Sequence, residues 1–89
     1  METRRDSEVK AYLDSLAIFI GNVVFTHRQN VGWTQTELAK CAETTQARIS
    51  QIEAGFGGVK LETVDRVFKA LGIQLPTPIN REDAAGIIS

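Results

Sequence analysis

The chain has 89 residues, a formal net charge of −1, a pI near 5.7 and a single cysteine, Cys41. This length fits one small domain, and the 43% hydrophobic and 24% charged content is typical of a globular protein rather than a disordered one. One cysteine excludes an internal disulfide and a cysteine-rich zinc site, and the polar amino terminus lacks the apolar segment of a signal peptide. We therefore expect a cytoplasmic protein with no membrane-spanning run, no metal and no cofactor, although the acidic balance counts mildly against nucleic-acid binding.

The first predicted element is a long amphipathic helix over about residues 7–29, which the sequence Asn30-Val31-Gly32 ends. Apolar residues recur at helical spacing along one face from Val9 to Val24. Because this is longer than most globular helices, a break at Asp14-Ser15 is an alternative. The stripe is wide for so small a domain, and it serves either the core or a dimer surface.

The strongest local signal predicts a second helix, over residues 35–42. Thr34 and Glu37 have the spacing of a capping box, in which each side chain bonds the other residue's backbone amide. Trp33 and Leu38 stand where a hydrophobic staple places its two apolar residues. The only tryptophan is therefore interpreted as structural.

A third helix is predicted over residues 46–54, with Thr45 as its N-cap and Gly55 as its stop. Only residues 43–45 separate it from the second helix, so the two form a helix-turn-helix. Side chains that can bond base edges occupy its outward side: a glutamine can bond adenine at two points, an alanine methyl can meet the thymine methyl, and an arginine can reach guanine or phosphate. These residues are Gln46, Ala47, Arg48 and Gln51.

The remaining chain predicts a fourth helix over residues 61–71, which Gly72 ends, and a short strand over residues 73–75. A last helical turn is expected between Asn80 and Ile88. The predicted organisation is a helical extension over residues 1–16, a helix-turn-helix domain over residues 17–75 and a tail over residues 76–89. The helix over residues 61–71 is expected to bury Leu61, Val64, Val67, Phe68 and Leu71.

No group of residues in the sequence has the spacing of a catalytic site. His27 has no second histidine or cysteine near it in the sequence, and we interpret it as a surface or packing residue rather than a metal ligand. Cys41 is interpreted as a small, partly buried hydrophobe, because no histidine is placed to activate it. The protein is therefore not expected to be an enzyme.

Residues 17–73, taken together, resemble the helix-turn-helix domain of lambdoid phage repressors and Cro, the XRE family. The resemblance implies an all-α, five-helix lambda-repressor-like DNA-binding domain, here with an extended N-terminal helix and a short C-terminal extension. It rests on Trp33-Thr34-Gln35, Glu37-Leu38-Ala39, Thr44-Thr45-Gln46, Ile49-Ser50-Gln51-Ile52-Glu53 and Gly55, followed by the helix that Gly72 ends.

The resemblance also implies roles for individual residues. Gln35 matches a glutamine that contacts phosphate and braces the recognition helix, and Thr45, Gln46 and Gln51 match DNA-contacting positions. The residues Arg28 and Glu53 match an internal ion pair that joins the first helix to the end of the recognition helix. There are two departures: Glu43 replaces a glycine of the turn, and Lys60 replaces a capping Ser or Thr, where it can instead contact phosphate.

The sequence thus predicts a transcriptional regulator, specifically a repressor, that binds double-stranded DNA as a homodimer. An alternative comes from residues 60–75, which are similar to the end of the DNA-binding domain in antitoxins of toxin–antitoxin pairs. In that case the chain would also bind a toxin protein. A third alternative is a protein-interaction module that binds no DNA.

Overall fold

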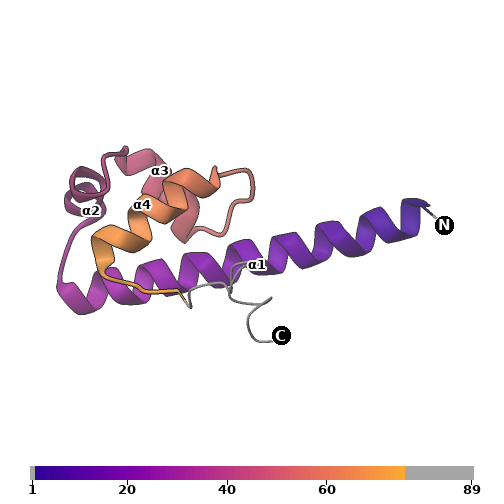
Figure 1. Cartoon of the computed structure of the whole chain (residues 1–89), viewed down its shortest axis with the longest axis horizontal. Helices are drawn as coiled ribbons and strands as arrows, with labels where there is room; N and C mark the ends of the chain where they lie inside the picture. Colours follow the sequence, from indigo (N-terminus) through magenta and orange to yellow (C-terminus); the bar gives the residue numbers. More distant parts are fainter. Residues whose placement is uncertain (1, 76–89) are drawn as a thin grey trace, which may run out of the picture.

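The computed structural model describes the backbone of residues 2–75 and the side chains of residues 6–75. These residues form four α-helices and no strand: α1 (Glu2–Val31), α2 (Gln35–Cys41), α3 (Gln46–Glu53) and α4 (Leu61–Leu71). Helices α3 and α4 pack against the C-terminal half of α1, and α2 packs against α3 and α4, while the N-terminal half of α1 projects beyond them (Figure 1). The all-α prediction is confirmed, and the fifth helix falls on residues outside the described part of the chain.

Helix α1 is one continuous helix of 30 residues. The predicted alternative, a break at Asp14-Ser15, is wrong. The Ser15 hydroxyl donates a hydrogen bond of 3.0 Å to the carbonyl of Ala11, one turn earlier, so this serine stays inside the helix instead of capping a new one. The helix ends at Gly32, whose left-handed φ of 77° allows its amide to bond the carbonyl of Arg28 at 3.0 Å.

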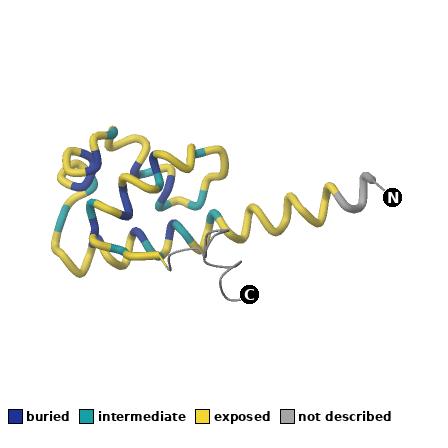
Figure 2. The backbone as a smooth tube through the Cα atoms, viewed as in Figure 1, coloured by how far each residue is buried: buried dark blue, intermediate teal, exposed yellow. Residues whose placement is uncertain are grey.

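The prediction that no run approaches membrane-spanning length is also wrong. The stretch Asp6–Val31 of α1 is long and apolar enough to cross a membrane, by length and composition alone. Its C-terminal half nevertheless belongs to the core of the domain, because Val24 is fully buried and Arg28 is 8% exposed among the shorter helices. Most of its N-terminal half is exposed (Figure 2).

The core lies between the C-terminal half of α1 and the other three helices. A glycine lets α1 approach α3 closely: a Cβ atom added at Gly21 would lie 2.4 Å from the carbonyl oxygen of Ile52. Residues from all four helices meet there, and the buried hydrophobic set is Val24, Leu38, Ala39, Ala42, Ile49, Ile52, Val67, Phe68 and Leu71.

Helix α4 has the predicted bounds. Gly72 adopts a left-handed φ of 72°, and the Ile73 amide donates to the Phe68 carbonyl at 2.9 Å, which returns Ile73 to the core. The predicted strand over residues 73–75 does not form, since no other described segment offers it a partner. One burial prediction is wrong, because Leu61 is 81% exposed at the start of the helix.

The turn between α2 and α3 places Glu43 at a φ of 55°, in the left-handed region. A residue with a Cβ is strained there, so Glu43→Gly should raise the free energy of unfolding by about 1 kcal/mol, as measured by urea denaturation. Gly72→Ala is the matched reverse change, because Gly72 has a similar φ and nothing would touch an added Cβ. It should cost about 1 kcal/mol. A neutral or destabilising Glu43→Gly would contradict the expected strain.

Candidate nucleic-acid interface

The N-terminus of α2 is held by the capping box predicted from the sequence. The Glu37 amide donates to Thr34 Oγ1 at 3.1 Å, and the Thr34 amide donates to Glu37 Oε1 at the same distance. Trp33 packs against the core beside this cap, while Leu38 is fully buried. These contacts set the direction in which α2 leaves the turn after α1, and α2 in turn supports α3.

Helix α3 is oriented by its two buried isoleucines. Ile49 and Ile52 face the core, so the opposite side of this short helix faces outward. Thr45 caps it by accepting a hydrogen bond of 3.2 Å from the Arg48 amide. The structure therefore exposes all four residues that the sequence placed on the outward face, namely Gln46, Ala47, Arg48 and Gln51.

A nearly buried ion pair joins α1 to the end of α3. Arg28 Nε donates to Glu53 Oε2 at 2.6 Å and Arg28 Nη2 donates to Glu53 Oε1 at 2.9 Å, with side-chain exposures of 10% and 6%. Arg28 Nη1 also donates to the Trp33 carbonyl at 2.8 Å. The hydrogen bond to Glu53 raises the pKa of Arg28. Because a guanidinium carries only N–H donors, both Glu53 oxygens act as acceptors in these bonds.

Two glutamines extend this pair to the outward face. Gln35 Nε2 donates to Glu53 Oε1 at 3.1 Å, which leaves the Gln35 oxygen pointing away from Glu53 as an acceptor. Gln46 Nε2 then donates to that oxygen at 2.6 Å. Because Glu53 Oε1 acts as an acceptor, Gln35 turns its Nε2 toward Glu53 and its oxygen toward Gln46, which sets the orientation of both amides. Gln46 therefore presents its Oε1 and its second N–H, which the internal chain of hydrogen bonds leaves unused.

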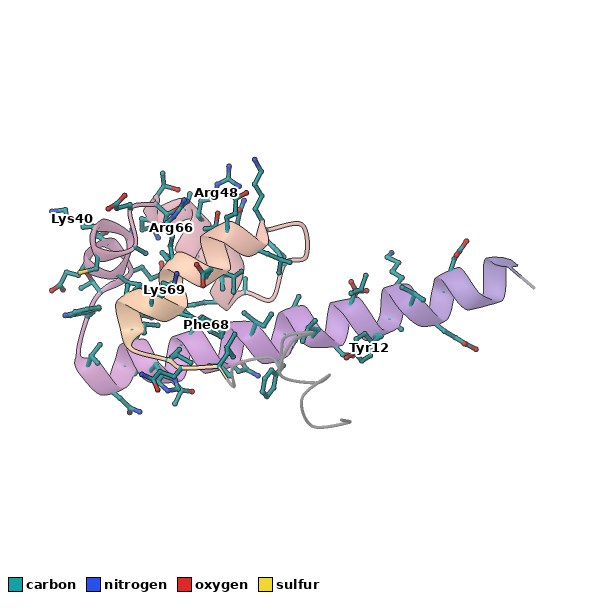
Figure 3. All side chains as sticks on the ribbon, in the orientation of Figure 1. Tyr12, Lys40, Arg48, Arg66, Phe68 and Lys69 are labelled. Atoms are coloured by element: carbon teal, nitrogen blue, oxygen red, sulfur yellow. The ribbon has the colours of Figure 1, made fainter. Side chains whose placement is uncertain are left out.

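A cleft beside the N-terminus of α3 gathers cationic side chains from two helices. Arg48 from α3, Lys60 before α4 and Arg66 on α4 line it, together with Glu43 and Glu62. Arg48 and Arg66 lie on the side of the domain away from α1 (Figure 3). The cleft lining thus has three cations and two carboxylates, whereas the whole chain has a net charge of −1. Lys60 makes no side-chain cap for α4, in agreement with its expected departure from the capping pattern.

Arg66 was not among the residues predicted from the sequence. Its spacing carried a usable signal, because Lys60, Thr63 and Arg66 are three residues apart and so lie along one side of the start of α4. Thr63 is buried, at 7% exposure, and lines the same cleft as the exposed Lys60 and Arg66.

Two predictions about isolated reactive side chains have different outcomes. His27 is exposed, as a surface residue should be, and its Nδ1–H donates to the Val23 carbonyl at 2.9 Å. Cys41 is exposed, so the prediction that it is partly buried is wrong. Cys41 is the last residue of α2 and faces solvent, whereas the next residue, Ala42, is buried in the core. Within the described residues, no group of three or more potential metal ligands gathers.

The geometry agrees with a match to a known family: a family model described as helix-turn-helix matches residues 26–77, more than half of the chain. The chain belongs to the XRE-type helix-turn-helix family. The XRE match begins near the end of α1 and continues past α4, so it includes the ion pair, both glutamines and the cationic cleft. XRE-type domains bind DNA and are not enzymes. No curated protein and no solved structure matches this XRE-type chain significantly.

Proposed function

We propose that this helix-turn-helix protein is a sequence-specific transcriptional repressor that acts in the cytoplasm and reads its operator with the outward face of α3. The supporting observation is the placement of Gln46, whose amide is held by Gln35 at the outer end of a hydrogen-bonded chain that starts at Arg28. A side chain held in this way is suited to reading a base edge rather than to stabilising the core.

Adenine is the base that fits the groups Gln46 leaves unused. Its Oε1 can accept from the adenine N6 amino group, and its second Nε2–H can donate to N7. The neighbouring Ala47 offers only a methyl group, which suits contact with a thymine methyl. Gln51, one turn further along α3, provides a second amide for a base edge or for the backbone.

Phosphate contacts would set the position of α3 in the major groove. Arg48, Lys60 and Arg66 line the cleft beside its N-terminus, where cations can meet the DNA backbone. Gln35 has one N–H beyond the bond to Glu53, and Thr45 keeps its hydroxyl proton for donation. These groups carry no base preference of their own, so they position the reading side chains.

We also propose that the protein binds its operator as a homodimer. Two copies related by a two-fold axis would place their α3 helices ~34 Å apart, on successive turns of one face of the duplex. The operator would then be close to a palindrome.

The central test is Gln46→Ala. Loss of the bidentate contact should weaken operator binding by about 1–3 kcal/mol and relax the preference at one base pair. The operator would first be selected from a random pool, and affinities would then be measured by fluorescence anisotropy on single-base variants. Gln29→Ala is the matched control, because Gln29 is an exposed glutamine on α1, outside the proposed surface. Unchanged affinity and base preference in the Gln46 variant would show that another face reads DNA.

The same titrations distinguish the alternatives. An interaction module would show no DNA affinity that falls with salt, whereas phosphate contacts give a steep dependence. The antitoxin alternative rests on the similarity of residues 60–75 to antitoxins in which a strand after the last helix pairs with that of a second copy. No feature of the described residues favours a toxin partner, so we propose the repressor alone.

A further inference from the structure

The projecting half of α1 carries apolar side chains that the domain leaves largely uncovered. We define the α1 seam as Val9, Leu13, Leu16, Ile20 and Val23. Val9 is 51% exposed, Leu13 53% and Leu16 40%, while the last two residues are half-buried against the core. Two large aromatic side chains border the seam, Tyr12 at 68% exposure and Phe19 at 64%. Figure 3 shows Tyr12 on the projecting part of the helix.

The spacing of the α1 seam is that of a helix-to-helix contact. Successive members are four, three, four and three residues apart, which keeps them on one line along the helix surface. Such alternation is the a and d pattern by which two α-helices interlock their side chains. It therefore indicates a helix as the covering partner, rather than a loop or an extended segment.

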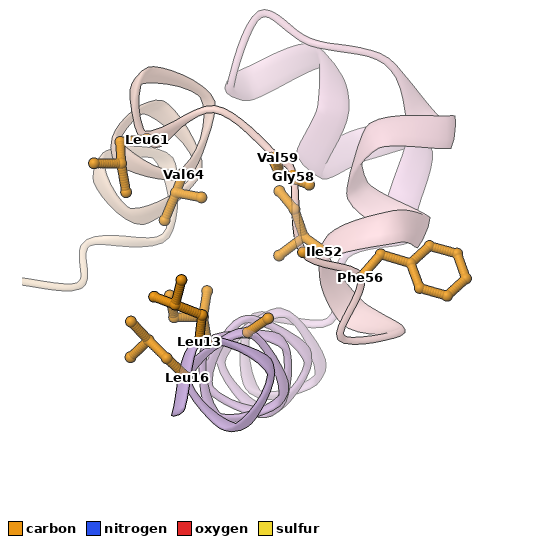
Figure 4. A pocket seen from close by; sticks show the side chains of 11 residues that line it. Leu13, Leu16, Ile52, Phe56, Gly58, Val59, Leu61 and Val64 are labelled. Atoms are coloured by element: carbon orange, nitrogen blue, oxygen red, sulfur yellow. The ribbon is translucent and has the colours of Figure 1, made fainter. Parts of the chain in front are cut away.

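The seam continues into an apolar groove of about 190 Å³ between α1, the loop after α3 and α4. Leu13, Leu16 and Ile20 belong both to the seam and to the wall of this groove. Figure 4 shows Leu13 and Val64 on facing walls, whereas Phe56 points away. A partner helix that packs on the seam would therefore also contact the groove, so its apolar contact surface would be wider than the seam alone.

The projecting half is unsuited to burial in a lipid bilayer. It carries Asp6, Glu8, Lys10 and Asp14, all exposed, and each would be costly in a hydrocarbon environment. A membrane span would also need the C-terminal half of α1, which is already packed in the domain core. A pairing of two helices leaves the charged residues in water and buries only the seam.

The area available is adequate for a pair of chains. The exposed parts of the seam and its two aromatic neighbours amount to roughly 400 Å² of apolar surface per chain, taking about 150–250 Å² for a whole aromatic side chain. Two copies would bury about 800 Å² of apolar surface, and polar flanks would bring the total near the ~1,200 Å² of small stable interfaces.

We propose that the α1 seam is the dimer interface and that its occupant is the α1 seam of a second copy, packed across a two-fold axis. A contact of this kind is self-complementary, so the same residues serve both chains. The cleft containing Arg48 and Arg66 lies on the opposite side of the domain from α1, so pairing leaves that side open (Figure 3). This inference deepens the proposed function, because it names the surface that would bring two reading helices together.

The test is sedimentation equilibrium of the full chain without DNA, from about 1 to 100 µM, a range that spans the affinities of weak to moderate dimers. Wild type should reach the dimer mass within this range. Leu13→Glu places a charge inside the interface and should weaken dimerisation about 100-fold or more. Ala11→Glu is the matched control, because Ala11 is exposed on the far side of the same turn and should dimerise as wild type does. Far-UV circular dichroism would show that both variants keep their helices.

Three results would overturn the inference: a wild-type monomer at every concentration, a Leu13→Glu dimer as tight as wild type, or equal weakening by both variants. Cosedimentation of a monomeric wild type with vesicles of phosphatidylcholine and phosphatidylglycerol would instead identify a lipid surface as the occupant. Because no DNA is present, these outcomes are independent of the Gln46 titration. A monomer that still reads its operator through Gln46 would refute the seam and leave the proposed reading face intact.

Discussion

Replacing Arg28 with methionine should lower the free energy of unfolding by about 3–5 kcal/mol, because it leaves the carboxylate of Glu53 buried and unpaired. Both side chains are nearly inaccessible, with exposures of 10% and 6%, so water cannot replace the lost partner. The Trp33 carbonyl loses a donor as well. A loss of this size is a large part of the stability of a small domain, and urea denaturation monitored by Trp33 fluorescence would measure it.

The exposed pair between Lys69 Nζ and Asp65 Oδ2, at 3.0 Å, is the control. Its side chains are 76% and 57% exposed, so Lys69→Met should cost less than about 0.5 kcal/mol. The double variant Arg28→Met/Glu53→Gln removes both buried charges and should recover part of the loss, since the uncompensated charge is gone. Equal costs for Arg28→Met and Lys69→Met would show that burial of the pair is not what matters.

Adding one methyl group at Gly21 should destabilise the domain by about 3 kcal/mol, the upper part of the range for overpacked cores. The Cβ of Gly21→Ala would lie 2.4 Å from the Ile52 carbonyl oxygen and 3.1 Å from that of Glu53. Both are backbone atoms of α3, so no side chain can move aside, and α1 and α3 would have to separate. Thermal and urea unfolding of the variant would measure the loss.

Gly57→Ala provides the comparison for Gly21→Ala. Nothing lies within 4 Å of a Cβ built at Gly57, and its φ is outside the left-handed region. That change should be neutral or stabilise by up to about 1 kcal/mol, because alanine restricts the unfolded chain. If Gly21→Ala lowered the free energy of unfolding no more than Gly57→Ala does, α1 and α3 would have to be able to separate at Gly21 at little cost.

The boundaries of the shorter helices could be predicted from sequence because local chemistry sets them. The capping box of Thr34 and Glu37, the cap at Thr45 and the left-handed Gly72 each act within a few residues. The wrong predictions concern residues whose local sequence pattern allows two structural outcomes. Ser15 resembles a cap, yet its hydroxyl bonds the preceding turn instead. Residues 73–75 alternate like a strand without a partner, and Leu61 continues the apolar pattern of α4 while standing outside the core.

The candidate site was predictable in its residue types but not in its connections. The outward side of α3 follows from helical periodicity once its two isoleucines are assigned to the core. The hydrogen bonds of Gln35 to Glu53 and to Gln46 join residues 18 and 11 positions apart, and only the packing of α2 on α3 brings them together. Arg66 was missed because its spacing from Lys60 and Thr63 gives no sign of Arg48, which the fold brings from α3 to the same cleft.

If Gln46 reads a base as proposed, its hydrogen bond to Gln35 also lowers the entropy cost of DNA binding. A long amide side chain that is free in solution loses rotamer freedom when it docks on a base, at a cost of about 0.5–1.5 kcal/mol. Here the loss occurs during folding, because the 2.6 Å hydrogen bond orders the side chain before any duplex arrives. The domain should therefore recognise its base by rigid docking. A change that breaks the hydrogen bond between Gln35 and Gln46 should weaken DNA binding even where every contact from Gln46 to DNA is kept.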